Sequence, residues 1–384
     1  MSAIDDTAVP SFVRRAMAEP MPAPITSTGW IGWVRQRLFG SIFSTILTVV
    51  ALYLLWLVVP PLVRFTLIDA VWTGTDRDAC LPEKAGRAVG ACWPFIWAKL
   101  PQLVYGFYPG PERWRVNLTF VLAAVLLAPL LVPTLPYKRE NAIAFFGVFP
   151  IVAFFLLVGG VFGLPYVDSH EWGGLLVTLV VAVTGIVASL PLGILLALGR
   201  RSKLPIVRTL SITFIEFWRG VPLITVLFFA TYMLPLFLPN SWTIDALVRA
   251  LVGVALFAAA NMAEVIRGGL QAIPRGQFEG AMALGLGYWQ MMGLIVLPQA
   301  LKLVIPGIVN TFIGLFKDTT LVLIVAIFDF LGQLRSAFAD PNWATPVTLF
   351  TGFAFAGLIY FCFCFGMSRY SQFVERRIDT ARRR

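Results

Sequence analysis

The stretch GGLLVTLVVAVTGIVASLPLGILLAL, residues 173–198, contains no charged side chain. An apolar run of about 20 residues is long enough to cross the hydrocarbon core of a bilayer as a helix. Within it, Gly185, Ser189, Gly193 and Ala197 recur at steps of four and therefore share one helical face. Small residues at this spacing let helix backbones approach closely in lipid. We expect a membrane-spanning helix that packs tightly against a neighbouring helix.

The composition of the whole chain agrees with this interpretation. Of its 384 residues, 58% are hydrophobic and 13% are charged, whereas a soluble domain is about 45–50% apolar and about 25% charged. The apolar residues also fall in runs of helix-spanning length. This excludes a soluble enzyme, an intrinsically disordered chain and a disulfide-dense secreted scaffold. We predict an all-α integral membrane protein.

Eight apolar runs are long enough to span the membrane. The fifth begins as an amphipathic segment near Leu204 and is fully apolar from Val221 to Leu238. A further apolar piece, 321–334, is too short to span alone, so we expect a broken or interfacial helix there. The other seven predicted spans are roughly 39–63, 116–135, 142–162, 173–198, 246–262, 301–316 and 347–367.

The distribution of basic residues predicts the orientation. The chain has a net charge of +10, and its Lys and Arg residues gather in both terminal tails and in the segments 137–140 and 199–208. The segments 163–171 and 339–346 contain none. Cytoplasmic loops carry the excess of Lys and Arg, so we expect both termini in the cytoplasm, with a tail over 1–38. The basic excess then indicates topology and contact with membrane lipid, and no nucleic-acid partner.

Two charge pairs lie inside predicted spans, where each charge is costly. Glu216 and Arg219 are three residues apart and can face one another, which favours an ion pair that fixes the fifth helix. Lys317 and Asp318 lie where the apolar pattern of the seventh span breaks, and could meet the two charges of a zwitterion. Alternatively, Lys317 extends to an interface and Asp318 caps the next helix.

The cysteines and the single histidine carry little chemistry. Cys80 and Cys92 lie in the predicted outer loop, about 64–115, where they could form a disulfide or remain free thiols. Cys362 and Cys364 are two apart on one helix and are expected to pack. With His170 as the only histidine, we predict no metal site.

The polar stretch 263–298 interrupts the apolar pattern. Pro274 and Gly276 predict a turn, and Glu279 follows in the first turn of a helix, where a carboxylate suits the macrodipole. Gly280, Ala281, Ala283 and Gly285 leave that helix with little side-chain bulk, so it could seat in a groove of a partner protein. The alternative is an ordinary connecting loop.

These residues carry a resemblance. Glu279-Gly-Ala, Gly285 and Ile295-Val-Leu-Pro298 resemble the EAA motif of membrane subunits of type I ATP-binding-cassette importers. Phe217-Trp-Arg-Gly-Val-Pro-Leu223 and Asn310-Thr-Phe-Ile-Gly-Leu-Phe-Lys-Asp-Thr-Thr320 resemble the polar amino-acid permease branch. The additional N-terminal spans resemble the M-type subunit of general L-amino-acid permeases.

The resemblance implies an architecture and partners. It implies a five-helix core over 169–375, after a three-helix extension over 39–168 and before a basic tail over 376–384. It also implies a second permease subunit, two copies of an ATPase subunit and a periplasmic amino-acid-binding protein in a bacterial inner membrane. The chain has no G-x-x-x-x-G-K-[ST] loop, so ATP and Mg²⁺ would be used by the ATPase chain. We therefore expect a transporter subunit that binds no cofactor and has no catalytic residues.

The resemblance also implies roles for particular residues. Those expected to couple to the ATPase are Glu279, Gly280, Ala281, Gly285, Leu297 and Pro298. The candidates for the substrate pathway are Asn310, Thr311, Lys317, Asp318 and Thr319. Many relatives carry an acidic residue where Thr311 stands, so either this subunit has broad specificity or its partner carries the site. Two alternatives stay open: a secondary transporter driven by an ion gradient, and a scaffold subunit without a substrate pocket.

Overall fold

The computed structural model describes residues 29–132, 135–239 and 243–382. It divides into two compact units, residues 1–68 and 69–384, which are described separately. In the described ranges the regular elements are helices, and β-structure is limited to isolated bridges. Seven helices are long and apolar enough to cross a membrane, and a bent pair raises the number to eight. The prediction of an all-α membrane protein with about eight spans is confirmed.

The first unit contains a short helix and one span. Helix α1 (Gly29–Leu38) is followed by α2 (Ile42–Val63) and a π-helical turn, η1 (Arg64–Ile68). Ser41 caps α2 by accepting a hydrogen bond at its Oγ from the Ser44 N–H, 3.1 Å away. The predicted tail 1–38 is therefore helical from Gly29 onward, and the remainder of that prediction lies outside the described residues.

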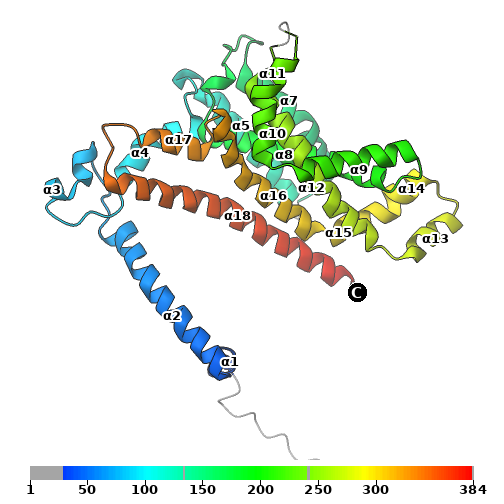
Figure 1. The fold of residues 1–384 in the computed structure, drawn as a ribbon, viewed down its shortest axis with the longest axis horizontal. Helices are drawn as coiled ribbons and strands as arrows, with labels where there is room; N and C mark the ends of the chain where they lie inside the picture. The colour runs from blue at the N-terminus through cyan, green and yellow to red at the C-terminus, as the bar shows by residue number, and fades with distance from the viewer. Residues whose placement is uncertain (1–28, 133–134, 240–242, 383–384) are drawn as a thin grey trace, which may run out of the picture. The chain divides into compact units, whose positions relative to one another are not determined.

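The second unit contains the remaining spans (Figure 1). Helices α8 and α12 pack together along their lengths, and the small-residue face of α8 forms their interface: Gly185, Ser189, Gly193 and Ala197 are all buried. A Cβ added to Gly193 would lie 2.8 Å from the Cβ of Met262 on α12. The other spans of this unit, apart from the bent pair, are α5 (Arg113–Leu131), α6–η4–α7 (Lys138–Val158), α8 (Gly174–Arg200), α12 (Ala246–Gln271), α16–η8 (Ile305–Val325) and α18 (Pro346–Arg382).

The fifth predicted span is bent. Helix α9 (Pro205–Gly220) meets the chain of α10 (Leu223–Phe228), η6 (Phe229–Met233) and α11 (Leu234–Phe237) at 101°. The break falls at Val221 and Pro222, which have extended backbone angles. Because Pro222 has no N–H to donate to the preceding turn, the helix cannot continue through it undisturbed. The bend lies where the sequence changes from amphipathic to fully apolar.

The seventh span is interrupted at both ends. Helix α15 (Leu297–Leu303) stops at Val304, α16 (Ile305–Asp318) follows, and the chain tightens into a 3-10 helix, η8 (Thr319–Val325). Ala326 then takes a left-handed conformation with φ of 59° and turns the chain toward a short helix, α17 (Phe330–Ala337). Asp329 caps α17 by accepting a hydrogen bond from the Gly332 N–H at 2.9 Å. This is the broken helix expected over 321–334.

Helix α18 is longer than the sequence indicates. The eighth span was expected to end near Met367, before a tail from Arg376, but one helix of 37 residues runs from Pro346 to Arg382. Only its first part is apolar, and basic side chains follow within the same helix. The end of hydrophobicity therefore does not mark the end of the helix here, and the segment predicted as a basic tail, 376–384, is helical as far as Arg382.

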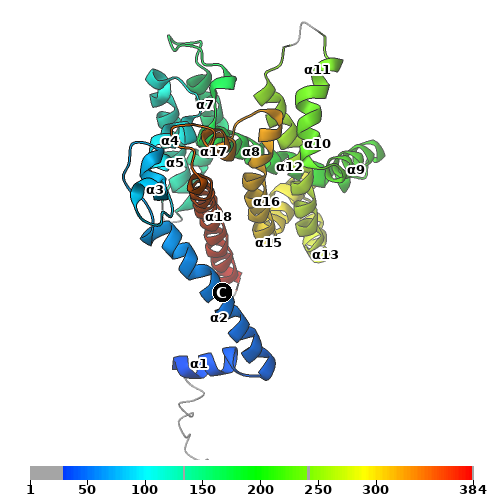
Figure 2. The same ribbon diagram turned by 60° about the vertical axis from the view of Figure 1, so that its left-hand side comes forward.

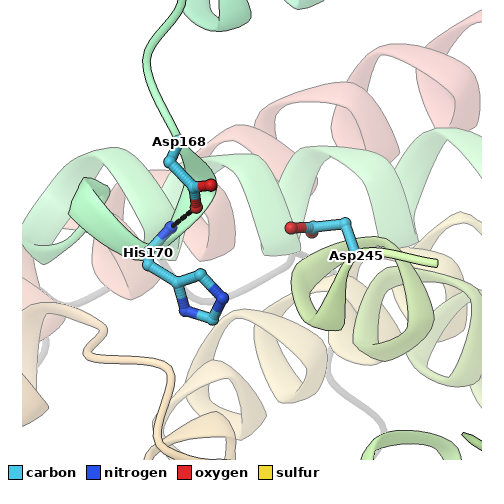
Figure 3. A group of neighbouring side chains, drawn as sticks. All are labelled: Asp168, His170 and Asp245. Atoms are coloured by element: carbon cyan, nitrogen blue, oxygen red, sulfur yellow. Dashed lines mark hydrogen bonds between the residues drawn. The ribbon is translucent and has the colours of Figure 1, made fainter. Parts of the chain in front are cut away.

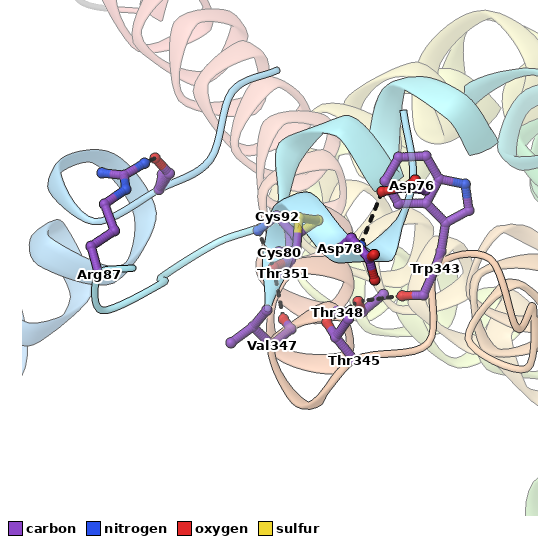
Figure 4. The surroundings of a disulfide bond; sticks show 11 residues. Asp76, Asp78, Cys80, Arg87, Cys92, Trp343, Thr345, Val347, Thr348 and Thr351 are labelled. Atoms are coloured by element: carbon purple, nitrogen blue, oxygen red, sulfur yellow. Dashed lines mark hydrogen bonds between the residues drawn. A yellow bond between two sulfur atoms is a disulfide. The ribbon is translucent and has the colours of Figure 1, made fainter. Parts of the chain in front are cut away.

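Residues 69–112, here called the disulfide segment, precede α5. They form η2 (Arg77–Cys80), α3 (Pro82–Ala85), α4 (Trp93–Tyr105) and η3 (Gly110–Glu112). Cys80 and Cys92 form a disulfide with their Cα atoms 5.7 Å apart, and both are fully buried (Figure 4). The Cys92 N–H donates to Thr351 Oγ1 on α18 at 2.9 Å. Of the two alternatives left open by the sequence, the structure forms the disulfide.

Candidate functional site

The predicted coupling helix is present as α13 (Arg275–Ala283), and its end depends on one glycine. Gly285 has φ of +72°, a left-handed conformation that side-chain-bearing residues rarely adopt. This lets the Gly285 N–H donate to Met282 O at 2.9 Å and the Leu286 N–H donate to Ala281 O at 3.2 Å. These bonds satisfy the last carbonyls of the helix. Gly285 therefore fixes where α13 stops and where the chain turns back.

Helix α13 has one buried face and one exposed face. Ala281 is only 2% exposed and packs in a cluster with Ile273, Met291 and Met292. On the opposite side, Glu279 and Gly280 are exposed, and a Cβ on Gly280 would meet no atom within 4 Å. Two large apolar side chains, Met282 and Leu284, are exposed beside them. The free face of α13 thus combines little bulk, apolar area and one carboxylate.

Several contacts hold α13 against the bundle. The guanidinium of Arg201 lies 5.5 Å from the ring centre of Phe278, and Arg201 also donates to Leu270 O at 2.9 Å. The side-chain amide of Gln277 accepts a hydrogen bond from that of Gln299, at 2.9 Å. The chain returns through α14 (Tyr288–Met291) and the π-helical η7 (Met292–Val296) to α15. Leu297 and Pro298, two of the predicted coupling residues, form the first turn of α15.

A cluster of five charged side chains lies close to α13 and is centred on Glu264 of α12. One Glu264 oxygen accepts from Arg200 of α8 at 2.9 Å, and the other accepts from Arg267 at 2.8 Å. Arg219 of α9 lies 3.7 Å from Glu264, a looser contact. Arg200 also binds Glu216 at 2.8 Å. We call Arg200, Glu216, Arg219, Glu264 and Arg267 the Glu264 cluster.

The Glu264 cluster corrects the predicted pair between Glu216 and Arg219. Each of these residues does help fix α9, but each binds a residue from another helix, Arg200 and Glu264 respectively. Glu264 itself was not predicted. A usable signal was present, because Glu264 and Arg267 are oppositely charged, lie three residues apart on one helix and can face one another. The cluster joins the ends of three helices where the chain enters α13.

The substrate-pathway candidates lie along α16 and η8 and do not form one cluster of contacts. The hydroxyls of Thr311 and Thr319 donate to backbone carbonyls within their own helix, those of Gly307 and Phe316. Asn310 and Lys317 are exposed and Asp318 is half-buried. The alternative role of Asp318 as a helix cap is wrong, because its side chain makes no capping hydrogen bond to η8. Their role in transport stays a prediction.

Sequence reasoning also missed two buried charges. Arg115 of α5 is fully buried and pairs with Glu112 at 2.9 Å, while donating to Pro165 O at 3.1 Å. Asp329, which lies between spans, is fully buried and accepts a hydrogen bond from Tyr360 at 3.1 Å. Burial raises the pKa of Asp329. Both charges are satisfied by neighbouring helices and loops, so we assign them to structure.

Asp168, His170 and Asp245 form the one described group whose side chains could together hold a metal ion, with ligand atoms within 4.8 Å of one another (Figure 3). Both side-chain oxygens of Asp245 and one of Asp168 already accept hydrogen bonds. The His170 N–H donates to Asp168 Oδ1, the Val248 N–H donates to Asp245 Oδ1, and the Ser169 hydroxyl binds Asp245 Oδ2. These bonds account for the group as a clasp between the loop before α8 and the start of α12.

Together, the broken spans, the tightly packed α8–α12 pair and the partly exposed α13 define a multi-pass helical membrane protein of the transport class. Residues 189–380 match the family described as "Binding-protein-dependent transport system inner membrane component". The match covers half of the chain, and the chain belongs to this family. It is therefore a multi-pass membrane component of a transport system.

Two relatives match along almost their whole length. The inner membrane amino-acid ABC transporter permease protein YhdY of Escherichia coli is 50% identical, over 94% of this chain and 97% of the relative. The second relative is the glutamate/glutamine/aspartate/asparagine transport system permease protein BztC of Rhodobacter capsulatus. It is 42% identical, over 96% of this chain and 98% of the relative. A crystal structure of an amino acid ABC transporter with histidines is 27% identical over 53% of this chain and 92% of that chain, with a TM-score of 0.46.

Proposed function

We propose that this chain is a membrane-spanning subunit of an ABC importer for L-amino acids, driven by a separate ATPase. The observation that carries the proposal is α13, whose exposed side presents Glu279, the small Gly280 and two apolar side chains, and whose buried side is fixed to the bundle. A helix held in this way can transmit a displacement by a partner protein to the membrane-spanning helices that it contacts. The names of the two full-length relatives support amino acids as the substrate class.

The complex would contain this chain, a second homologous permease subunit, two ATPase copies and a periplasmic binding protein. The sequence has no phosphate-binding loop of its own, which supports a separate ATPase that uses ATP and Mg²⁺. Both termini and α13 would lie in the cytoplasm, in agreement with the basic segments 137–140 and 199–208. The disulfide segment would then face the periplasm, an oxidising compartment that permits its disulfide.

Coupling would use Glu279, Gly280, Ala281 and Gly285, with Leu297 and Pro298 holding the return of the chain. Arg201, which contacts Phe278 of α13, is the chain neighbour of Arg200 in the Glu264 cluster, so movement of α13 would reach α8 and α9 through these residues. Asn310, Thr311, Lys317, Asp318 and Thr319 remain our candidates for contact with substrate. The absence of an acidic side chain at Thr311 favours broad specificity or a substrate site in the partner subunit.

Replacing Gly285 by Asp tests the coupling assignment. A side chain at φ of +72° is strained, so the end of α13 should be displaced. We expect the rate of ATP hydrolysis stimulated by the binding protein to fall at least about tenfold. This corresponds to a rise of about 1.4 kcal/mol in the activation free energy. The measurement is hydrolysis by the reconstituted complex, together with uptake of labelled amino acids. Glu279→Ala, combined with it, should add to the loss.

Gly293→Asp is the matched control, because Gly293 is exposed in η7 outside α13 and a Cβ there would meet no atom within 4 Å. The coupling role of α13 would be contradicted if Gly285→Asp left stimulated ATP hydrolysis unchanged. It would also be contradicted if Gly293→Asp reduced hydrolysis equally. Uptake that continues without ATP but collapses with an uncoupler would instead favour a secondary transporter.

A further inference from the structure

Helix α1 carries two tryptophans and two arginines and does not continue the line of α2. Figure 2 shows α1 running across the end of α2, and Figure 1 shows the same corner from another side. The corner is fixed by a hydrogen bond from Thr48 Oγ1 of α2 to Leu38 O at the end of α1, at 2.8 Å. The Ser41 cap then starts α2 after a three-residue corner. The Thr48–Leu38 hydrogen bond and the Ser41 cap therefore fix the direction of α1 relative to α2.

The exposed side chains of α1 are of the interfacial type. Trp30 is 78% exposed and Trp33 is 59% exposed. An open hollow of about 380 Å³ is lined by Trp30, Val34, Arg35 and Phe39. It therefore offers apolar walls together with one guanidinium-bearing side chain. Tryptophan is enriched at the level of the lipid headgroups, where its ring meets apolar chains and its N–H meets water.

The charged side chains of α1 and α2 are all basic. Arg35 and Arg37 are both exposed in the last turn of α1. The sequence contains no Asp or Glu between Glu19 and Asp69, so no acidic side chain within that stretch can neutralise them. An arginine guanidinium binds phosphate through paired hydrogen bonds. The charge of α1 is thus complementary to an anionic headgroup.

The position of α1 next to a membrane span indicates that a membrane lipid occupies the hollow. Helix α2 begins three residues later and is an apolar span with no buried residue within its own unit. A helix joined by three residues to the end of a span ends at the bilayer surface, and the exposed Trp and Arg side chains of α1 suit the headgroup layer there. We propose that α1 is an interfacial helix with a site for one anionic phospholipid. Arg35, which lines the hollow, binds its phosphate, Arg37 adds a second positive charge at the level of the headgroups, and the hollow beside Trp30 takes part of an acyl chain.

Lipid counting tests this proposal directly. The full chain, purified in detergent, is titrated with phosphatidylglycerol, and bound lipids are counted by native mass spectrometry. Phosphatidylcholine with the same acyl chains serves as the headgroup control. Each cation near an anionic surface contributes about 1 kcal/mol, so Arg35→Gln with Arg37→Gln should lower affinity for phosphatidylglycerol roughly thirtyfold. Trp30→Ala should weaken binding of both lipids.

The control variant has the same charge change elsewhere on the predicted cytoplasmic side: Lys138→Gln with Arg139→Gln on α6 (Lys138–Ile143), where both residues are exposed. It should retain tight phosphatidylglycerol binding. Unchanged binding in the α1 variant overturns the proposal. An equal fall in the α6 control also overturns it, because the charge effect would then be general. An unchanged thermal unfolding midpoint in the α1 variant verifies that loss of binding is not loss of fold.

Discussion

The two ends of α8 are held by different kinds of contact. Its first residue, Gly174, adjoins Asp329 and the disulfide segment, where a covalent bond and a buried cluster of aromatic side chains fix the chain. Its last residue, Arg200, belongs to the Glu264 cluster, whose ion pairs add to the apolar packing of Ala197 and Leu198 beside Met262. A disulfide and close packing tolerate little displacement. Ion pairs among several arginines can exchange partners as helices shift.

This difference teaches how one helix can be both an anchor and a moving part. The 27 residues of α8 separate the two ends by about 40 Å. At the Gly174 end, Lys99 of α4 pairs with Asp340 and Gln102 binds Gln333 of α17 at 3.1 Å, so α4 and α17 are joined. At the Arg200 end, the 3.7 Å contact of Arg219 is the longest in its cluster. Movement driven from α13 would therefore be largest at the Arg200 end.

The largest expected effect comes from Glu264→Gln. Its side chain is 15% exposed and is the common partner of Arg200, Arg219 and Arg267, so its removal leaves three cations close together. Breaking a largely buried ion pair costs about 3–5 kcal/mol. We expect a large fall in the free energy of unfolding, measured by denaturant titration in detergent. Glu216→Gln, whose side chain is 55% exposed, is the control and should cost under about 1 kcal/mol. An equal fall in the free energy of unfolding in Glu264→Gln and Glu216→Gln would contradict the central role of Glu264.

An intermediate effect is expected from Cys80→Ser with Cys92→Ser. Loss of a disulfide costs about 2–4 kcal/mol, and residues 69–112 should be cleaved faster by a protease. Combined with Glu264→Gln, the loss should be additive within about 0.5 kcal/mol, because the two regions share no contact partner. Cys362→Ser with Cys364→Ser, which removes two free thiols, should leave cleavage unchanged. Strong non-additivity would show that the two ends are not independent.

The smallest effect concerns Lys99 and Asp340. The Lys99 ammonium holds the pKa of Asp340 below its usual range. A lowered pKa means that the stabilisation is present above about pH 4, the ordinary value of an Asp carboxyl, and is lost as the pH falls through the lowered pKa. Asp340→Asn should remove this acid-dependent part, under about 1 kcal/mol. Unfolding measured from pH 6 down to pH 3 checks it, and an unaltered pH profile in the variant would contradict it.

The spans could be predicted because hydrophobicity along the chain is a local property. The eight runs, the small-residue face of α8 and the bend before Pro222 all follow from residues within one segment. The end of α18 could not be predicted in this way. A helix that leaves lipid needs no apolar side chains to continue, so its polar turns resemble a tail.

The site was predictable only as far as its contacts are local. The short helix after Pro274 could be predicted from neighbouring residues, whereas the coupling roles of Glu279, Gly280 and Gly285 rest on the resemblance and stay a prediction. The partners of Glu216 and Arg219 could not, since they come from α8 and α12 and depend on how these helices cross. The spacing of Cys80 and Cys92 likewise did not predict whether they form a disulfide, because this depends on how the chain before α4 folds back.

The 3-10 helix η8 has a mechanical consequence. Runs longer than three or four residues are uncommon for this helix, yet η8 has seven. A 3-10 helix rises about 2.0 Å per residue and an α-helix about 1.5 Å. Rewinding η8 as α-helix would thus shorten it by about 3.5 Å and turn its end by roughly 140°. Since α17 is fastened through Gln102 and Asp329, such a stroke would pull on α16 and displace Lys317 and Asp318 along the span.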